Sequence, residues 1–162
     1  MRNATLLPLV AGRVRVLHVL ARGARTVVVF AVQAPSGGWA VVPTEYEGVG
    51  RSSWLPLADG VVLAPAGDPG GRGYAWQSFW QSGHLQQKAM ASDTVAVLGP
   101  PGAVTARVEG RSGEVALTLA GRYGEGVVPE ARHVRFLDAG GAVVGETDVA
   151  PLLRPGRHVV GS

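Results

Sequence analysis

The 162-residue chain contains no cysteine and is poor in charged residues. Without cysteine it can form no disulfide framework, thiolate zinc site, iron–sulfur cluster or cysteine nucleophile. Aspartate, glutamate, lysine and arginine together make up 17% of the sequence, which is below the usual share of about a quarter. Long charged helices and coiled coils are therefore not expected.

The chain also lacks long apolar runs. Its longest uninterrupted apolar stretches, such as residues 27–32, are much shorter than the roughly 18 residues that a membrane-spanning helix needs. A short apolar stretch after Arg2 resembles a signal peptide, but Pro8 interrupts it and Arg13 follows at once. We interpret residues 1–11 as a leading segment and expect no transmembrane segment in the chain.

Lysine is nearly missing, and the net charge of +3 comes from arginine. The chain has 14 arginines and only Lys88, together with no isoleucine, a pattern typical of high-GC coding sequences. The arginines stand in dispersed pairs such as Arg13 and Arg15, whereas nucleic-acid binding requires a cluster on one face. A cytosolic Arg-rich regulator that binds nucleic acid is therefore kept only as a further alternative.

Apolar residues and turn residues dominate what is present, with 46% apolar residues, 24 glycines and 11 prolines. Alternating and β-branched stretches predict a hairpin from residues 13–20 and 26–33, followed by a third strand at 39–42. Pro43 should end this ladder because proline has no N–H to donate, and residues 44–53 should form a loop.

The rest of the chain continues this pattern. Further strands are predicted at residues 61–64, 94–98, 103–109, 115–119, 132–137 and 142–149. A Gly/Pro-rich connector at 65–73 cannot be regular structure and should be the most mobile element. Its composition favours a flexible connector without a binding role.

Amphipathic strands must pair their apolar faces with another sheet, so we predict an all-β fold, an antiparallel β-sandwich of immunoglobulin-like or related type. It can be one sandwich or two packed subdomains, residues 12–92 and 93–153, with a tail at 154–162. Because a unit of about 60 residues is marginal alone, the second half should pack on the first.

Motifs of catalysis are missing from the sequence. There is no Gly-x-Ser-x-Gly elbow, phosphate loop, dinucleotide fingerprint or EF-hand loop, and the four histidines show no metal-ligand spacing. We therefore predict no catalytic residues, no metal site and no cofactor, and interpret the protein as not being an enzyme.

The best binding candidate is the aromatic stretch 74–81, expected to form one arm of a hairpin, with a short helix within 76–91 as the alternative. In a strand, Tyr74, Trp76 and Trp80 share one face and could stack on sugars or contact a protein, with Arg72 beside them. Burial of these rings in the core is the favoured interpretation, because a β domain needs its aromatic residues inside.

Two segments carry a resemblance to a known type of module. They are Val-Leu-Gly-Pro-Pro-Gly-Ala at 97–103 and Val-Arg-Phe-Leu-Asp-Ala-Gly-Gly-Ala-Val-Val-Gly-Glu at 134–146. They resemble small β-sandwich modules of secreted and membrane-tethered proteins from high-GC Gram-positive bacteria. The second segment is also similar to the terminal hairpin of extracellular domains with a Phe-x-Leu/Tyr-Asp signature, and Leu-Leu-Arg-Pro-Gly at 152–156 to the motif that follows it.

This resemblance implies an envelope-exposed module without enzymatic residues. The leading hypothesis is a non-enzymatic extracytoplasmic domain for protein interaction or scaffolding, secreted or anchored through a segment outside these residues. Its partner would be an envelope protein or another region of the same larger protein. The main alternative is a glycan-binding or glycan-processing domain that uses exposed aromatic side chains on cell-wall glycan.

Overall fold

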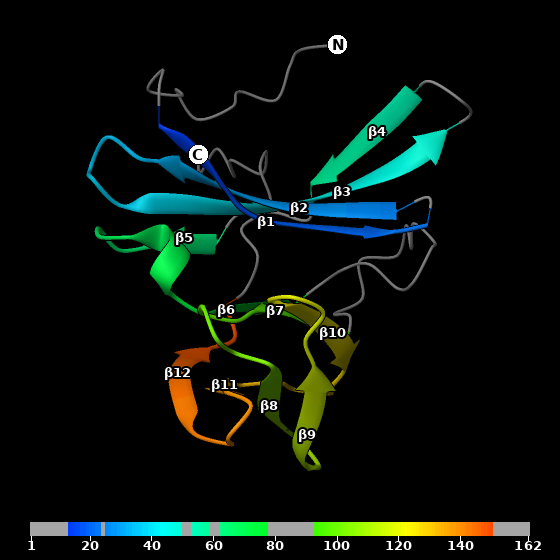
Figure 1. Ribbon diagram of the computed structural model, residues 1–162, viewed down its shortest axis with the longest axis vertical. Helices are drawn as coiled ribbons and strands as arrows, with labels where there is room; N and C mark the ends of the chain where they lie inside the picture. The colour runs from blue at the N-terminus through cyan, green and yellow to red at the C-terminus, as the bar shows by residue number, and fades with distance from the viewer. Residues whose placement is uncertain (1–12, 24, 50–52, 59–61, 78–92, 151–162) are drawn as a thin grey trace, which may run out of the picture.

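The computed structural model describes residues 13–23, 25–49, 53–58, 62–77 and 93–150 (Figure 1). Within these residues the chain forms twelve strands, one short 3-10 turn and no α-helix, which confirms the predicted all-β class. The strands are β1 (Val14–Arg22), β2 (Arg25–Gln33), β3 (Trp39–Val49), β4 (Ser53–Ala58), β5 (Val62–Ala64), β6 (Tyr74–Gln77), β7 (Thr94–Leu98), β8 (Thr105–Gly110), β9 (Gly113–Thr118), β10 (Tyr123–Val127), β11 (His133–Leu137) and β12 (Val143–Asp148).

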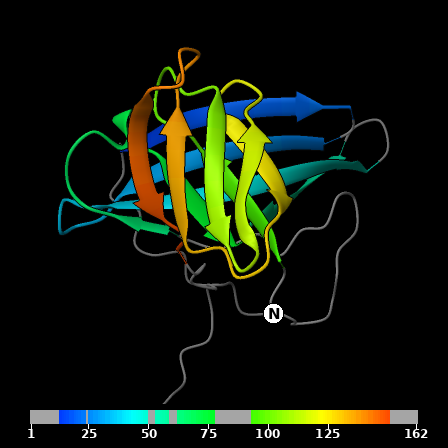
Figure 2. The same cartoon turned by 90° about the horizontal axis from the view of Figure 1, so that it is seen from below.

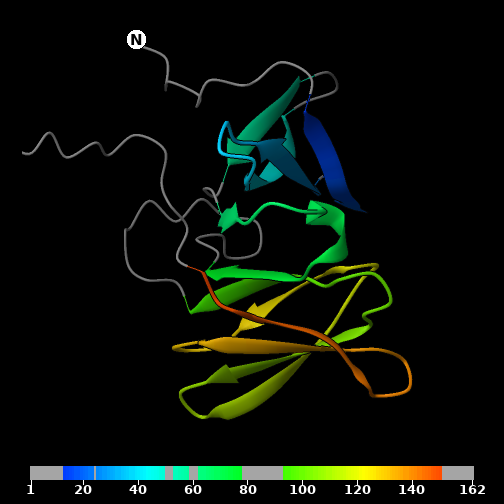
Figure 3. The same ribbon diagram turned by 90° about the vertical axis from the view of Figure 1, so that its left-hand side faces the viewer.

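The strands form three antiparallel sheets. The N-terminal sheet has the order β1-β2-β3-β4, with β5 also paired to β3. The middle sheet has the order β10-β7-β6, and the C-terminal sheet the order β12-β11-β8-β9. The three sheets lie in layers, with the middle sheet between the other two (Figure 3). From below, the strands of the C-terminal sheet lie side by side and run across the direction of the N-terminal strands (Figure 2).

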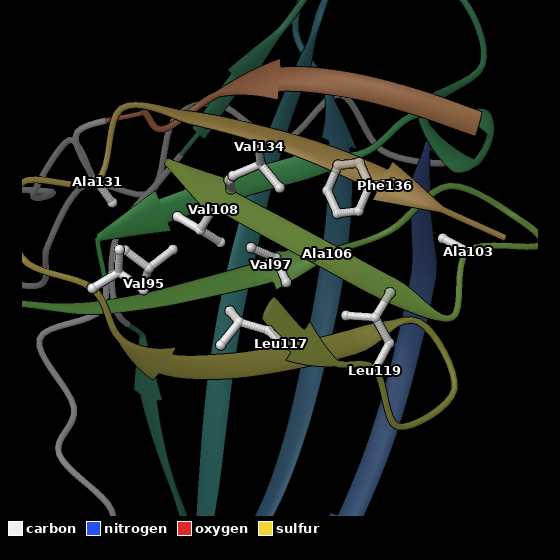
Figure 4. Close-up of a cluster of buried hydrophobic side chains, with 12 residues drawn as sticks. Val95, Val97, Ala103, Ala106, Val108, Leu117, Leu119, Ala131, Val134 and Phe136 are labelled. Carbon is white, nitrogen blue, oxygen red and sulfur yellow. The ribbon is translucent and has the colours of Figure 1, made fainter. Parts of the chain in front are cut away.

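The middle sheet is buried on both faces, and β7 shows why. All five of its residues, Thr94 to Leu98, are buried. Because side chains alternate across a strand, Ala96 and Leu98 enter a core shared with the N-terminal sheet, and Val95 and Val97 enter a core shared with the C-terminal sheet. The second core also holds Phe136 and Val134 of β11 (Figure 4). One sheet therefore supports two cores.

The middle and C-terminal sheets together form a sandwich of three plus four strands. In chain order, β6 and β7 belong to the middle sheet, β8 and β9 to the C-terminal sheet, β10 to the middle sheet, and β11 and β12 to the C-terminal sheet, a Greek-key order like that of immunoglobulin-like sandwiches. The middle sheet takes β6 from before residue 92 and β7 and β10 from after it. The second half thus packs on the first, while the division into subdomains 12–92 and 93–153 stays a prediction.

The predicted first hairpin is confirmed by β1 and β2, but the predicted end at Pro43 is wrong. The strand β3 continues through Pro43 to Val49, and part of the expected loop 44–53 is strand. Pro43 pairs with Val29 of β2, but on the other side it lies between the partners of β5, which end at Val41, and those of β4, which begin at Thr44. A missing N–H is tolerated at a position without a ladder partner on that side.

Candidate binding cleft

The Gly/Pro connector 65–73 contains a short regular element, contrary to the prediction that it cannot be regular structure. Its centre is a 3-10 turn at Pro69–Gly71, capped by Asp68, whose carboxylate accepts a hydrogen bond from the Gly70 N–H at 3.0 Å. The Arg72 guanidinium donates to the Ala66 carbonyl at 2.8 Å and thereby closes the connector on itself. Composition suggested mobility, but these hydrogen bonds decide the local structure.

Side chains from the N-terminal and middle sheets also form hydrogen bonds with this connector. The indole N–H of Trp39 donates to the Gly67 carbonyl, and the Tyr74 hydroxyl donates to the Pro69 carbonyl, both at 2.8 Å. Arg15 contacts Asp68 at 3.2 Å and lies 5.5 Å from the centre of the Trp39 ring. The connector therefore links the N-terminal sheet to β6.

Arg122, in the turn between β9 and β10, completes this attachment. Its Nε donates to the Gly99 carbonyl at 2.7 Å, and its Nη2 donates to the carbonyls of Gly70 at 2.9 Å and Arg72 at 3.4 Å. Burial lowers the pKa of Arg122, whereas burial raises the pKa of the neighbouring Tyr74. One arginine thus fixes the connector to the sandwich through three carbonyl groups.

The fixed connector forms one side of an open cleft with a volume of about 550 Å³. Strand β5 and the connector line one side, β6 lies next to them, and residues 144–148 of β12 line the opposite side. Leu63 of β5 and Arg72 are among the lining residues, and the pairing of Leu63 with Ala40 directs its 66% exposed side chain to the face of the N-terminal sheet turned away from the core. The volume is in the range of known ligand sites.

Strand β12 presents to this cleft an edge that is open as far as Asp148; just beyond it, Ala150 is paired with β6, and its N–H donates to the Ala75 carbonyl at 2.8 Å. Among the described strands it pairs only with β11, and the Val149 N–H donates to the Arg132 carbonyl of the same ladder at 2.9 Å. Because hydrogen-bonding direction alternates along an antiparallel strand, the backbone N–H and C=O of Glu146 and Asp148 point away from β11. Both residues line the cleft, so its wall carries backbone donors and acceptors.

The cleft offers charge and backbone hydrogen bonding rather than an activated nucleophile. Its lining contains no serine, cysteine or histidine. Asp148 extends beyond it to accept a 2.8 Å hydrogen bond from His133 Nδ1 in the surface of the C-terminal sheet. Among the described residues, no group of three or more histidines and acidic residues is placed to hold a metal ion.

The four residues singled out from the sequence do not form one exposed surface. Tyr74 and Trp76 are buried, at 5% and 0% exposure, and share the core with Tyr123, whose ring centre lies 6.3 Å from that of Trp76. Neither ring is free to stack on a sugar, because their face of β6 packs against the N-terminal sheet. Trp80, like the rest of 78–92, lies outside the described residues, and Arg72 reaches the cleft.

The acidic edge at Glu146 and Asp148 was not among the predicted site residues. The sequence predicts residues 142–149 as the last arm of a hairpin, which is correct, but an open edge depends on which strands meet in space. The only local signal is the polar run Glu146-Thr147-Asp148 after two valines, and such polar residues are common in surface strands.

No family model, curated protein or solved structure matches this chain. No helix in the part of the chain that the structure describes is long and apolar enough to cross a membrane. The proposed function is therefore based on the cleft and the molecular surface.

Proposed function

We propose that this protein is a non-enzymatic interaction module whose cleft binds an extended polypeptide segment as an additional strand beside β12. The observation that carries the proposal is the open edge at Glu146 and Asp148, whose backbone groups are directed into a cleft of about 550 Å³. Strand addition obtains its affinity from such main-chain hydrogen bonds and its specificity from neighbouring side-chain contacts.

The opposite side of the cleft supplies these side-chain contacts. The Arg72 guanidinium provides a positive charge near the fixed connector. On the β12 side, Glu146 provides a carboxylate at the edge of the cleft, whereas the Asp148 carboxylate is hydrogen-bonded to His133. A bound segment that carries an acidic side chain toward Arg72 and a basic side chain toward Glu146 fits this arrangement.

We place this module outside the cytoplasm, attached to or secreted from a bacterial cell, because of its resemblance to envelope modules. The bound segment would belong to an envelope protein or to another region of the same larger protein. Burial of Tyr74 and Trp76 removes the support for glycan stacking by these two rings. Arg107, Arg111, Arg132 and Arg135 each pair with a glutamate, which leaves little support for nucleic-acid binding by this part of the surface.

A peptide-display experiment tests the proposal. Random 12-residue peptides are selected on the intact chain, and the dissociation constants of the selected peptides are measured by fluorescence anisotropy. Replacing Glu146 by proline removes an N–H that points into the cleft and leaves the β11 ladder unchanged. We expect Glu146→Pro to weaken binding at least tenfold.

Two control variants separate strand addition from other causes. Glu146→Ala removes the carboxylate but keeps the N–H, so it should retain most of the affinity. Ala116→Pro places a proline on β9, the opposite edge of the same sheet, and should leave binding unchanged. Failure to select any peptide, or equal binding by folded Glu146→Pro, would refute the proposal.

A further inference from the structure

The N-terminal sheet has an outer face, turned away from the sandwich, that consists of apolar and neutral residues. Its inner residues Val27, Val29 and Ala31 are at most 6% exposed and belong to the core. Cross-strand pairing places the alternate residues together on the other face. This outer face contains Val14, Val16, Val19, Ala21, Thr26, Val28, Phe30, Val32, Ala40, Val42, Thr44 and Tyr46.

The β1 part of this face is open to solvent, whereas Ala40 and Thr44 of β3 are buried, at 5% and 7% exposure. Val14, Val16 and Val19 are 53%, 56% and 55% exposed. A bulge between Val16 and His18 inserts one extra residue, which keeps Val19 on the outer face while His18 turns inward. Without this bulge, regular alternation would direct Val19 toward the core.

The composition of this face differs from that of an ordinary solvated sheet surface. Among its side chains that the structure describes, none is charged. The outer face of the C-terminal sheet instead carries Arg107, Glu114 and Arg135, which pair across strands. An antiparallel sheet with one face in solvent normally has polar residues on that face, whereas contiguous exposed apolar surface marks an interaction site.

We propose that this outer face is a self-association surface on which a second copy of the chain packs face to face. A two-fold dimer requires a surface that is complementary to itself. An apolar face without charges meets this requirement, since two copies bring no like charges together there despite the net charge of +3. If the face bound a different protein, we would expect it to carry charged residues at its edge or a polar residue that fixes how the partner is aligned.

The size of the face corresponds to a small interface. With strands ~4.8 Å apart and ~3.4 Å per residue, strands β1 to β3, of which β1 and β2 have nine residues each, span roughly 14 Å by 30 Å. Two such faces cover on the order of 900 Å², close to but below the roughly 1,000 Å² of a stable specific interface, as in weak and transient complexes. The expected dimer is consequently a reversible one.

Sedimentation velocity of the full chain over a concentration series tests this proposal. The wild-type chain should shift with concentration from 16.7 kDa toward twice that mass. In Val16→Lys/Val19→Lys, two charges on the face should weaken dimerisation at least tenfold. Val143→Lys, at a valine that is 51% exposed on β12, is the matched control and should dimerise like the wild type.

Each outcome decides the question. A wild-type chain that remains monomeric at about 100 µM overturns the proposal and leaves the face to a different partner or to another segment of the chain. Equal weakening by Val143→Lys and by the double variant also overturns it, because the effect would then be one of general charge. Circular dichroism verifies that all variants are folded.

Discussion

At the scale of single residues, the close packing of Phe136 depends on a glycine. Phe136 is completely buried between the middle and C-terminal sheets, and its ring lies against Gly73, just before β6. A Cβ atom at Gly73 would overlap the edge of this ring. Interiors are packed too densely to absorb such an overlap without moving neighbouring groups.

We expect Gly73→Ala to lower the free energy of unfolding by about 1–3 kcal/mol, the usual cost of overpacking a core. Gly140→Ala is the control, because a Cβ there has an ordinary 3.4 Å contact with Asp138. Chemical denaturation of both variants measures the difference. Equal stability of Gly73→Ala and the wild type would show that Phe136 can move aside.

At the scale of elements, the connector 65–73 takes its conformation from the adjacent Tyr74 and from two residues that are distant in sequence. Trp39 and Tyr74 hold the carbonyls of Gly67 and Pro69, and Arg122 holds that of Gly70. Hydrogen bonds that involve a charged donor contribute more than neutral ones, so Arg122 should be the strongest of these attachments. One side of the binding cleft thus depends on a residue outside it.

Arg122→Ala should destabilise the protein by about 1–3 kcal/mol and speed amide hydrogen exchange in residues 65–73. The loss follows from the three carbonyls that then lack their donor. Arg107→Ala, which removes an exposed ion pair with Glu114, should cost less than about 1 kcal/mol. Hydrogen exchange with mass spectrometry distinguishes local loosening from a global effect, and unchanged exchange in 65–73 would contradict this role of Arg122.

At the scale of the whole molecule, a histidine lies where the N-terminal sheet meets the sandwich. His18 of β1 lies against the turn at Gly121, close to Arg122, and its Nε2 is buried without a hydrogen-bond partner among the described residues. Burial and the charge of Arg122 lower the pKa of His18 below 6.5. The folded protein therefore prefers neutral His18, while the unfolded chain takes up a proton near pH 6.5.

Stability should consequently be lost as the pH falls below about 6.5, until the lowered pKa of folded His18 is reached. Above pH 6.5 this contribution is fully present, because His18 is neutral in both states. Urea denaturation between pH 5 and pH 8, compared between the wild type and His18→Gln, measures the effect. Parallel pH profiles of the two proteins would show that His18 does not contribute.

Most of the fold could be predicted from the local alternation of apolar and polar residues, and the strands that were missed have local causes. Strands with regular alternation, such as β8 and β11, were predictable because every second side chain enters the core. Strand β10 was not predicted, since Gly124 and Gly126 resemble turn residues. A Cβ at these positions would meet Leu119 and Leu117, so the glycines allow close packing within the sandwich.

The binding cleft could not be predicted, because its parts are far apart in the sequence. Arg72 was singled out for its place beside the aromatic stretch, but the cleft forms only when β5 and β12 approach each other. Burial of Tyr74 and Trp76 was the favoured interpretation and is confirmed. Whether a strand edge stays open depends on the complete sheet order, which local residue patterns do not encode.

The double role of the middle sheet constrains how the chain matures during synthesis. The core beneath the N-terminal sheet joins Val29 of β2 to Leu98 of β7 and Tyr123 of β10. A ribosome must therefore release residues beyond 123 before this core can close. Until then, the nascent N-terminal sheet exposes apolar residues on both faces, and during that interval it would be a natural substrate for chaperones.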